Sequence, residues 1–161
     1  MLKEAIMLCP ETVWQQEKKF YYLSYHTVIF LDYYVSRPVS SFQPILTYSL
    51  TDADKLPPGA VDDVLPDRFY SQKEMLACLV AIRDKCKQLV LLATDGQLME
   101  RWIEDDEIEM HGLCPGLVEN YTLLEILFYS LRHVQHHVGQ LNIILRQKAN
   151  VAAGWVSLVD E

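Results

Sequence analysis

Three histidines lie close together in the second half of the sequence, at positions 133, 136 and 137. His133 and His137 are four residues apart, which on an α-helix places their imidazoles on one face, one turn apart. With this spacing two histidines of one helix can bind a single metal ion, as in the helices of zinc proteases. Those proteases also need a glutamate directly after the first histidine as the general base. Because this position is Val134, the sequence does not predict a protease.

The segment that contains these histidines, residues 122–148, is predicted to form one long amphipathic helix. Thr122 and Glu125 match a capping box, in which each side chain binds the backbone N–H of the other residue. Arg146 and Lys148 lie in the last turn, where the helix dipole favours cations. Apolar residues at three- and four-residue steps predict the buried face, which comprises Leu124, Leu127, Phe128, Leu131, Val134, Val138, Leu141 and Leu145.

Another histidine, His26, lies in an aromatic segment that is predicted to be a helix over residues 20–36. Its apolar steps include Tyr22, one turn before His26, so we expect His26 to face the core. If it faces His133 and His137, three neutral imidazoles from two helices form one site inside a helical bundle. Three protein ligands leave at least one coordination position open, which is the arrangement of catalytic rather than structural zinc sites.

Neighbouring side chains can complete such a site. Gln140 lies on the same helical face as His133, and Tyr129 lies one turn before it. Either can line a pocket or orient a ligand imidazole by a hydrogen bond. Tyr22 is a further pocket residue, and His136 is either a supporting or a surface residue. The sequence identifies no catalytic side chain. The alternative is that the histidines are hydrogen-bonded core residues that bind no metal.

The remaining elements predict an all-α protein. Residues 1–9 form a short first helix, and residues 71–93 form a third helix that begins with a second capping box. Residues 37–70, which hold five of the seven prolines, and residues 94–121 are irregular, and no strand is predicted. The longer connection either covers a pocket, offers a partner surface or has no role. Four helices with two long links indicate a four-helix bundle with crossover connections.

Composition bounds the class of protein. A chain of 161 residues, half of them hydrophobic, is expected to form one domain over residues 1–161. The net charge of −8 and the lack of a basic cluster argue against nucleic acid and anionic membranes as partners. Four cysteines without a CxxC pair are typical of reduced thiols. We find no signal peptide and no apolar span long enough for a membrane, and expect a cytoplasmic protein.

Two segments carry a family resemblance. LRHVQHHVGQLN at 131–142 and YLSYHTVIFLDYY at 22–34 are similar to motifs of the DinB/YfiT-like superfamily of metal-binding four-helix bundles. The more specific motif is a histidine, three residues, a second histidine, and then a small residue and glutamine. The resemblance covers residues 12–157. It implies that His26, His133 and His137 bind a divalent ion, usually zinc or nickel.

The resemblance also implies an activity. Characterised branches of this superfamily are thiol-dependent enzymes, such as bacillithiol S-transferases and mycothiol-dependent isomerases, and homodimers are common. We therefore expect a metal-dependent thiol transferase or hydrolase that uses a low-molecular-weight thiol and an electrophilic small molecule. The alternative is a non-catalytic metal- or ligand-binding dimer with a role in stress responses. The first helix is shorter than is usual in the family, which would leave part of the core to a dimer partner.

Overall fold

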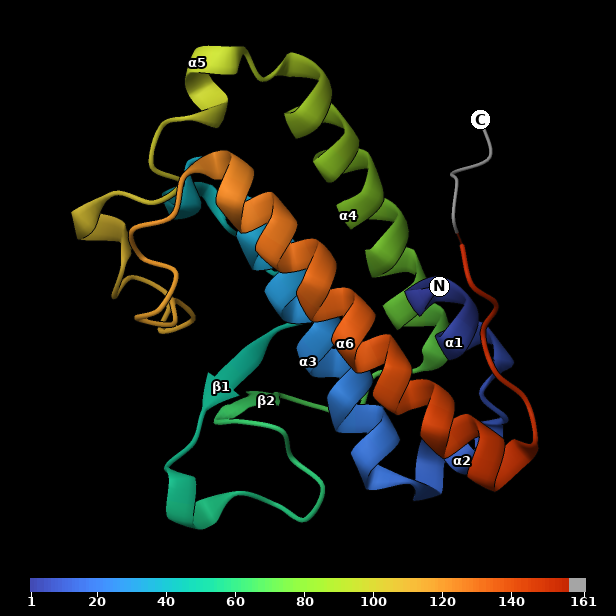
Figure 1. Ribbon diagram of the computed structural model, residues 1–161. Coiled ribbons are helices and arrows are strands. Elements are labelled where there is room, and N and C mark those ends of the chain that lie inside the picture. The colour runs from blue at the N-terminus through green and yellow to red at the C-terminus, as the bar shows by residue number, and fades with distance from the viewer. Residues whose placement is uncertain (157–161) are drawn as a thin grey trace.

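The computed structural model describes residues 1–156 and is mainly helical, with one small sheet (Figure 1). The α-helices are α1 (Leu2–Leu8), α2 (Glu11–Gln16), α3 (Lys18–Tyr34), α4 (Gln72–Leu92), α5 (Asp95–Leu98) and α6 (Leu123–Ala149). Short 3₁₀ turns are η1 (Val39–Ser41), η2 (Ala53–Lys55) and η3 (Asp105–Glu107), and the strands are β1 (Tyr48–Leu50) and β2 (Val64–Pro66). Among the described residues, no helix combines the length and apolar composition needed to span a bilayer.

The ends of the long helices follow the local signals in the sequence. At the start of α6 the Thr122 hydroxyl accepts from the backbone N–H of Glu125 at 3.2 Å, and the Glu125 carboxylate accepts from that of Thr122 at 2.8 Å. The same reciprocal pair forms between Ser71 and Glu74 at the start of α4. Helix α6 ends at Ala149, and the capping residue Asn150 adopts a left-handed φ of 54°. Both predicted capping boxes are confirmed.

The prediction that the chain contains no strand is wrong. Strands β1 and β2 pair antiparallel, with Tyr48 opposite Pro66 and Leu50 opposite Val64. Each strand is only three residues long, so neither shows the alternation over four or more residues that identifies a strand in a sequence. The hairpin is fastened to α3 by Tyr25, whose hydroxyl donates to the carbonyl of Thr47 at 2.9 Å.

Helix α3 is the centre of the molecule. It packs against α2, α4, α6 and β2, and side chains on all of its sides are buried. A helix that is buried on all sides is one that its neighbours enclose. The shorter α1 packs against both α4 and α6 and lies beside the lower end of α4 in Figure 1. The two helices that carry the predicted histidine ligands, α3 and α6, are in direct contact.

The predicted buried face of α6 is correct only in its second half. Val138, Leu141 and Leu145 are fully buried, whereas the side chains of Phe128 and Leu131 are 60% and 54% exposed. The reason is the length of α1, which at seven residues is about 10 Å long and covers only one end of the 27-residue α6. The first half of α6 instead buries a rotated set of side chains, Leu123, Ile126 and Ser130.

A partly buried ion pair joins α3 to α4. The Lys85 ammonium donates to the Asp32 carboxylate at 2.6 Å, to the Asp32 carbonyl at 3.1 Å and to the Ser36 hydroxyl at 2.5 Å. Asp32 and Ser36 are both buried. Because an ammonium has three N–H donors, all of its hydrogen-bonding capacity is used. This cluster is complete with the groups that the chain itself supplies.

Candidate metal centre

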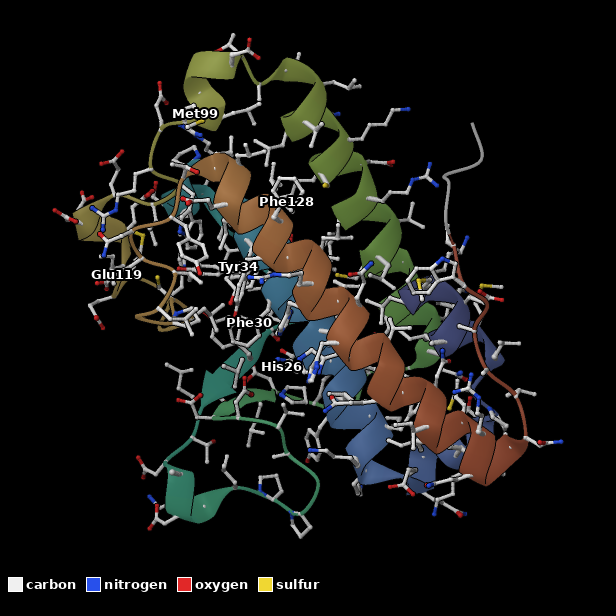
Figure 2. All side chains as sticks on the ribbon, viewed as in Figure 1. His26, Phe30, Tyr34, Met99, Glu119 and Phe128 are labelled. Atoms are coloured by element: carbon white, nitrogen blue, oxygen red, sulfur yellow. The ribbon has the colours of Figure 1, made fainter. Side chains whose placement is uncertain are left out.

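Helices α3 and α6 bring three predicted ligands to one point. The Nε2 atoms of His26 and His133 are 2.9 Å apart, and those of His133 and His137 are 3.0 Å apart. Potential ligand atoms of all three side chains lie within 4.8 Å of one another. Figure 2 shows His26 at the place where α3 passes beside α6. The structure therefore juxtaposes the residues that the sequence singled out, from positions more than a hundred residues apart.

Two of the imidazoles are fixed by partners on their outer nitrogens. The Nδ1 atom of His26 lies 2.7 Å from a carboxylate oxygen of Asp62, and the Nδ1 atom of His137 lies 2.9 Å from the amide oxygen of Gln140. These oxygens accept hydrogen bonds, so both Nδ1 atoms carry the proton. A neutral imidazole has only one N–H, and the Nε2 atoms of His26 and His137 are therefore acceptors with free lone pairs.

His133 cannot satisfy both of these acceptors. A proton on its Nε2 can be donated fully to only one of the two facing nitrogens. Its Nδ1 atom is buried and has no hydrogen-bond partner in the described part of the chain. If the proton is on Nδ1 instead, three Nε2 lone pairs point toward one another. Three convergent imidazole lone pairs are a donor set that suits zinc and similar divalent ions, so the residues present fit such an ion.

The protonation states also favour metal binding. Burial, reinforced by neighbouring imidazoles, lowers the pKa of His133 to about 3. Burial likewise lowers the pKa of His137 to about 4, although its hydrogen bond with Gln140 acts in the opposite direction. Both imidazoles are therefore neutral near pH 7, which is the form that a metal ion requires.

Aromatic rings form one wall of the centre. The Tyr129 ring lies nearly parallel to that of His133, with ring centroids 6.0 Å apart. The Phe30 ring lies 4.7 Å from His26. Figure 2 labels Phe30 and Tyr34 on the same helix as His26, in successive turns of α3. Apolar surroundings of this kind reduce the local dielectric and limit the access of water to the imidazoles.

The other predicted site residues lie at different distances from the centre. Gln140 binds His137 directly, as expected for a residue that orients a ligand. His136 is exposed, and its ring lies 5.0 Å from that of His137 without joining the three-histidine cluster. Tyr22 is half-buried on α3 and packs against Tyr21. The immediate supporting residues are thus Gln140 and Tyr129, while His136 and Tyr22 lie further out.

Asp62 is the residue of the centre that the sequence did not predict. It lies in the connection between β1 and β2, and its second carboxylate oxygen accepts from the backbone N–H of Val64 at 3.2 Å. This bond fixes the carboxylate that holds His26. In the sequence nothing distinguishes Asp62 from its neighbour Asp63, because only the fold of the hairpin decides which of them faces α3.

Comparison of the chain with protein-family models, with curated proteins and with solved structures finds no match. Function is therefore inferred from the three imidazoles and their surroundings. The arrangement offers three convergent imidazole nitrogens, from two rings held by outer hydrogen bonds and a third ring between them, beside an aromatic wall. Such a donor set can bind a divalent ion while leaving room for a further ligand.

Proposed function

We propose that the protein is a metal-dependent enzyme in which His26, His133 and His137 bind one divalent ion, most simply zinc or nickel. The observation that carries the proposal is the convergence of three Nε2 atoms, with the Nδ1 atoms of His26 and His137 already used as donors. The reaction class is thiol S-transfer or hydrolysis. A divalent ion bound by three imidazoles lowers the pKa of a coordinated thiol or water and so supplies a nucleophile near neutral pH.

The side chains around the imidazoles have separate tasks in this proposal. Asp62 holds the His26 ring in the Nδ1–H tautomer and fixes its orientation. Gln140 fixes the tautomer and orientation of His137. Tyr129 restricts the rotation of the His133 ring by stacking on it. A low-molecular-weight thiol and an electrophilic small molecule are the proposed substrates for the transfer reaction.

The order of helices supports a DinB/YfiT-like four-helix bundle. We assign α1, α3, α4 and α6 to its four helices, with α1 as the shortened first one. One ligand then comes from the second helix and two from the fourth, as the resemblance implies. The connections between α3 and α4 and between α4 and α6 become the two long crossovers.

A second candidate is a non-catalytic protein that binds a metal or a small ligand at the same centre. It is favoured by the lack of a free general base beside the imidazoles. Among their hydrogen-bond partners within residues 1–156, Asp62 is the only carboxylate, and it is already bound to His26. General acid–base catalysis needs a group free to exchange a proton with the substrate. Turnover of a substrate by the metal-loaded protein would exclude this candidate.

Metal analysis of tag-free protein is the decisive experiment for the proposed centre. We expect about one equivalent of divalent metal per chain in the wild type and in His136→Ala, and almost none in His133→Ala. His136→Ala is the matched control because this exposed histidine lies on the same helix outside the cluster. Equal metal contents in both variants, or no metal in any of the three proteins, would overturn the proposed site.

The reaction class needs a separate assay. Metal-loaded protein is mixed with a thiol and an electrophilic aryl halide, or with activated esters and amides. The proposal expects a saturable rate that chelation abolishes and added metal restores, and that His133→Ala lacks. A metal-loaded protein that is inert toward all of these compounds would support the non-catalytic candidate instead.

A further inference from the structure

A cavity of about 590 Å³ lies between the segment that follows α3, the second half of α4, and the start of α6. Its volume is in the range of small-molecule binding sites. It is found at the end of α4 that leads into α5, whereas α1 lies beside the other end of α4 (Figure 1). None of the three histidines of the proposed metal centre is among its lining residues. The cavity is therefore a second candidate site, separate from that centre.

Much of the cavity wall is apolar. Helix α4 contributes Lys85, Gln88, Leu89 and Leu92, whose spacing places them on one side of the helix. Leu123, the first residue of α6, adds a buried apolar side chain. Leu92 is 78% exposed in the protein alone, so apolar surface remains that a bound molecule can remove from water. This wall suits a ligand with an apolar body.

The charged residues of the cavity favour an anion. The chain has 22 acidic and 14 basic residues. Among the described residues that line the cavity none is acidic, whereas Arg37 and Lys85 are basic. A cleft lined by charges of one sign attracts ligands of the opposite sign. On this acidic protein, the cavity is thus a place that an anionic ligand can approach.

Arg37 is the cation with hydrogen-bond donors to spare. It donates to the carbonyl of Gln97 at 3.1 Å and to the carboxylate of Glu100 at 2.6 Å, and these two bonds fix the guanidinium. A guanidinium has five N–H donors, so three remain free within residues 1–156. The donors of Lys85 are already used within the chain. The Arg37 side chain is 25% exposed, and its planar group matches a carboxylate.

We propose that this cavity binds a small carboxylic acid with an apolar chain. Arg37 holds the carboxylate, and the chain lies against Leu89, Leu92 and Leu123. The site combines an apolar wall with one fixed, incompletely used cation, which is the usual composition of a pocket for an amphipathic small molecule. It does not depend on the proposed metal centre or on the reaction proposed there.

Isothermal titration calorimetry with four soluble probes tests the chemistry of the ligand. Octanoate has both the carboxylate and the apolar chain, 1-octanol and octylammonium have the chain without the negative charge, and acetate has the carboxylate without the chain. We expect octanoate to bind about tenfold more tightly than 1-octanol, because hydrogen bonds to a charged acceptor are stronger than those to a neutral one. Octylammonium and acetate are expected to show no measurable binding. Equal affinities for the three octyl compounds would overturn the proposal.

Variants of the cation test the role of Arg37. Arg37→Gln is expected to weaken octanoate binding about tenfold and to leave the binding of 1-octanol unchanged. Glu100 is 59% exposed and does not line the cavity. Glu100→Gln removes a carboxylate that competes for Arg37 and is expected to strengthen octanoate binding about threefold. If the Arg37–Glu100 pair only maintained the structure, both variants would weaken binding. Arg83→Gln, on an exposed side chain of α4 outside the cavity, is the matched control.

A variant of the wall tests where the apolar chain lies. Leu92→Asn is expected to weaken the binding of both octanoate and 1-octanol about fivefold, because it removes apolar surface from the cavity. Leu91→Asn is the matched control, since Leu91 is similarly exposed on the same helix but does not line the cavity. Circular dichroism is expected to show both variants folded, because both side chains are mostly exposed to solvent.

Chelation separates this site from the proposed metal centre, because a carboxylate can also bind a metal ion. Octanoate is expected to bind with the same affinity before and after treatment of the protein with a chelator. Loss of binding on chelation would place octanoate at a metal ion and overturn the proposal. It would also be overturned if octanoate did not bind at millimolar concentration, or bound Arg37→Gln as tightly as the wild type.

Discussion

Two polar clusters lie on different parts of α3, and only one of them has a hydrogen-bond partner for each of its polar groups. In the first, Lys85 directs its three N–H donors at the Asp32 carboxylate, the Asp32 carbonyl and Ser36. In the second, His26 and His137 point acceptor lone pairs at His133, which cannot satisfy both. The first cluster contains its own cation. The second leaves an acceptor lone pair that no donor of the described residues satisfies, and in the proposed function a metal ion binds there.

In the proposed function, the first cluster contributes to stability and the second binds the metal. A buried charge is tolerated when a partner and hydrogen bonds surround it, and it then ties two helices together. A group of neutral imidazoles costs less to bury, but it leaves polar atoms such as His133 Nδ1 unpaired. From this difference we expect a metal ion to stabilise the histidine cluster alone. Loss of Lys85 is expected to destabilise the fold without changing the metal content.

The largest expected effect is stabilisation by metal. At a free metal concentration of 1,000 times Kd, the free energy of unfolding of the wild type is expected to rise by about 4 kcal/mol. For a domain of this size the melting temperature then rises by roughly 10 °C. His133→Ala is expected to show no such shift, and His136→Ala to behave as the wild type. Thermal melts with and without a chelator measure this. An equal shift in His133→Ala would mean that the metal binds elsewhere.

Removal of Lys85 is expected to lower the stability of the protein and to leave its metal content unchanged. Lys85→Met leaves the Asp32 carboxylate buried without its cation and is expected to lower the free energy of unfolding by about 3 kcal/mol. This lies at the low end for a buried pair, because the Lys85 side chain is 35% exposed. Urea unfolding gives the value, and Lys87→Met on the exposed side of α4 is the control. Metal content is expected to be unchanged, and its loss would show that the two clusters are coupled.

The outer partner of His26 tests how strictly the imidazoles are held. Asp62→Ala removes the carboxylate that fixes the His26 tautomer and is expected to weaken metal affinity about 10- to 100-fold. Asp63→Ala changes the adjacent carboxylate, which makes no side-chain contact with His26, and is expected to leave the affinity unchanged. Competition with a chromophoric chelator measures both. Equal affinities would remove Asp62 from the proposed centre.

Helices and the histidine pair could be predicted because their signals are local. The capping residues Thr122 and Ser71 act within one turn, and the spacing of His133 and His137 fixes their separation once the segment is helical. His26 is on another helix, and its direction followed from the apolar positions around it. These inferences required no knowledge of the tertiary fold, apart from the assumption that α3 faces α6.

The remaining features depend on tertiary packing. Strands β1 and β2 are too short to show a periodic pattern, and only their pairing brings Asp62 to His26. The face that α6 buries near Phe128 depends on how far α1 extends along α6. The periodicity of the α6 sequence carries no information about the length of α1. An apolar row therefore predicted a buried face without identifying whether the same chain covers it.

The smallest expected effect is the pH dependence of the metal-free protein. The pKa of His133 is about 3 and that of His137 about 4 in the folded state, against an ordinary value of 6.5. Below pH 6.5 these imidazoles bind protons in the unfolded chain but not in the folded chain. Their contribution to the free energy of unfolding is therefore fully present above pH 6.5 and is lost as the pH decreases toward the folded pKa values.

Between about pH 7.5 and pH 5.5, each of these histidines is expected to lower the free energy of unfolding by roughly 1 kcal/mol, allowing for partial exposure. His133→Phe removes one titrating imidazole and is expected to show a smaller decrease than the wild type, whereas the exposed control His136→Phe keeps the full decrease. Urea unfolding of chelator-treated protein at both pH values gives the comparison. If His133→Phe loses as much stability between these pH values as the wild type, His133 does not have a lowered pKa in the folded state. The cluster would then lack the neutral imidazole that metal binding at His133 requires.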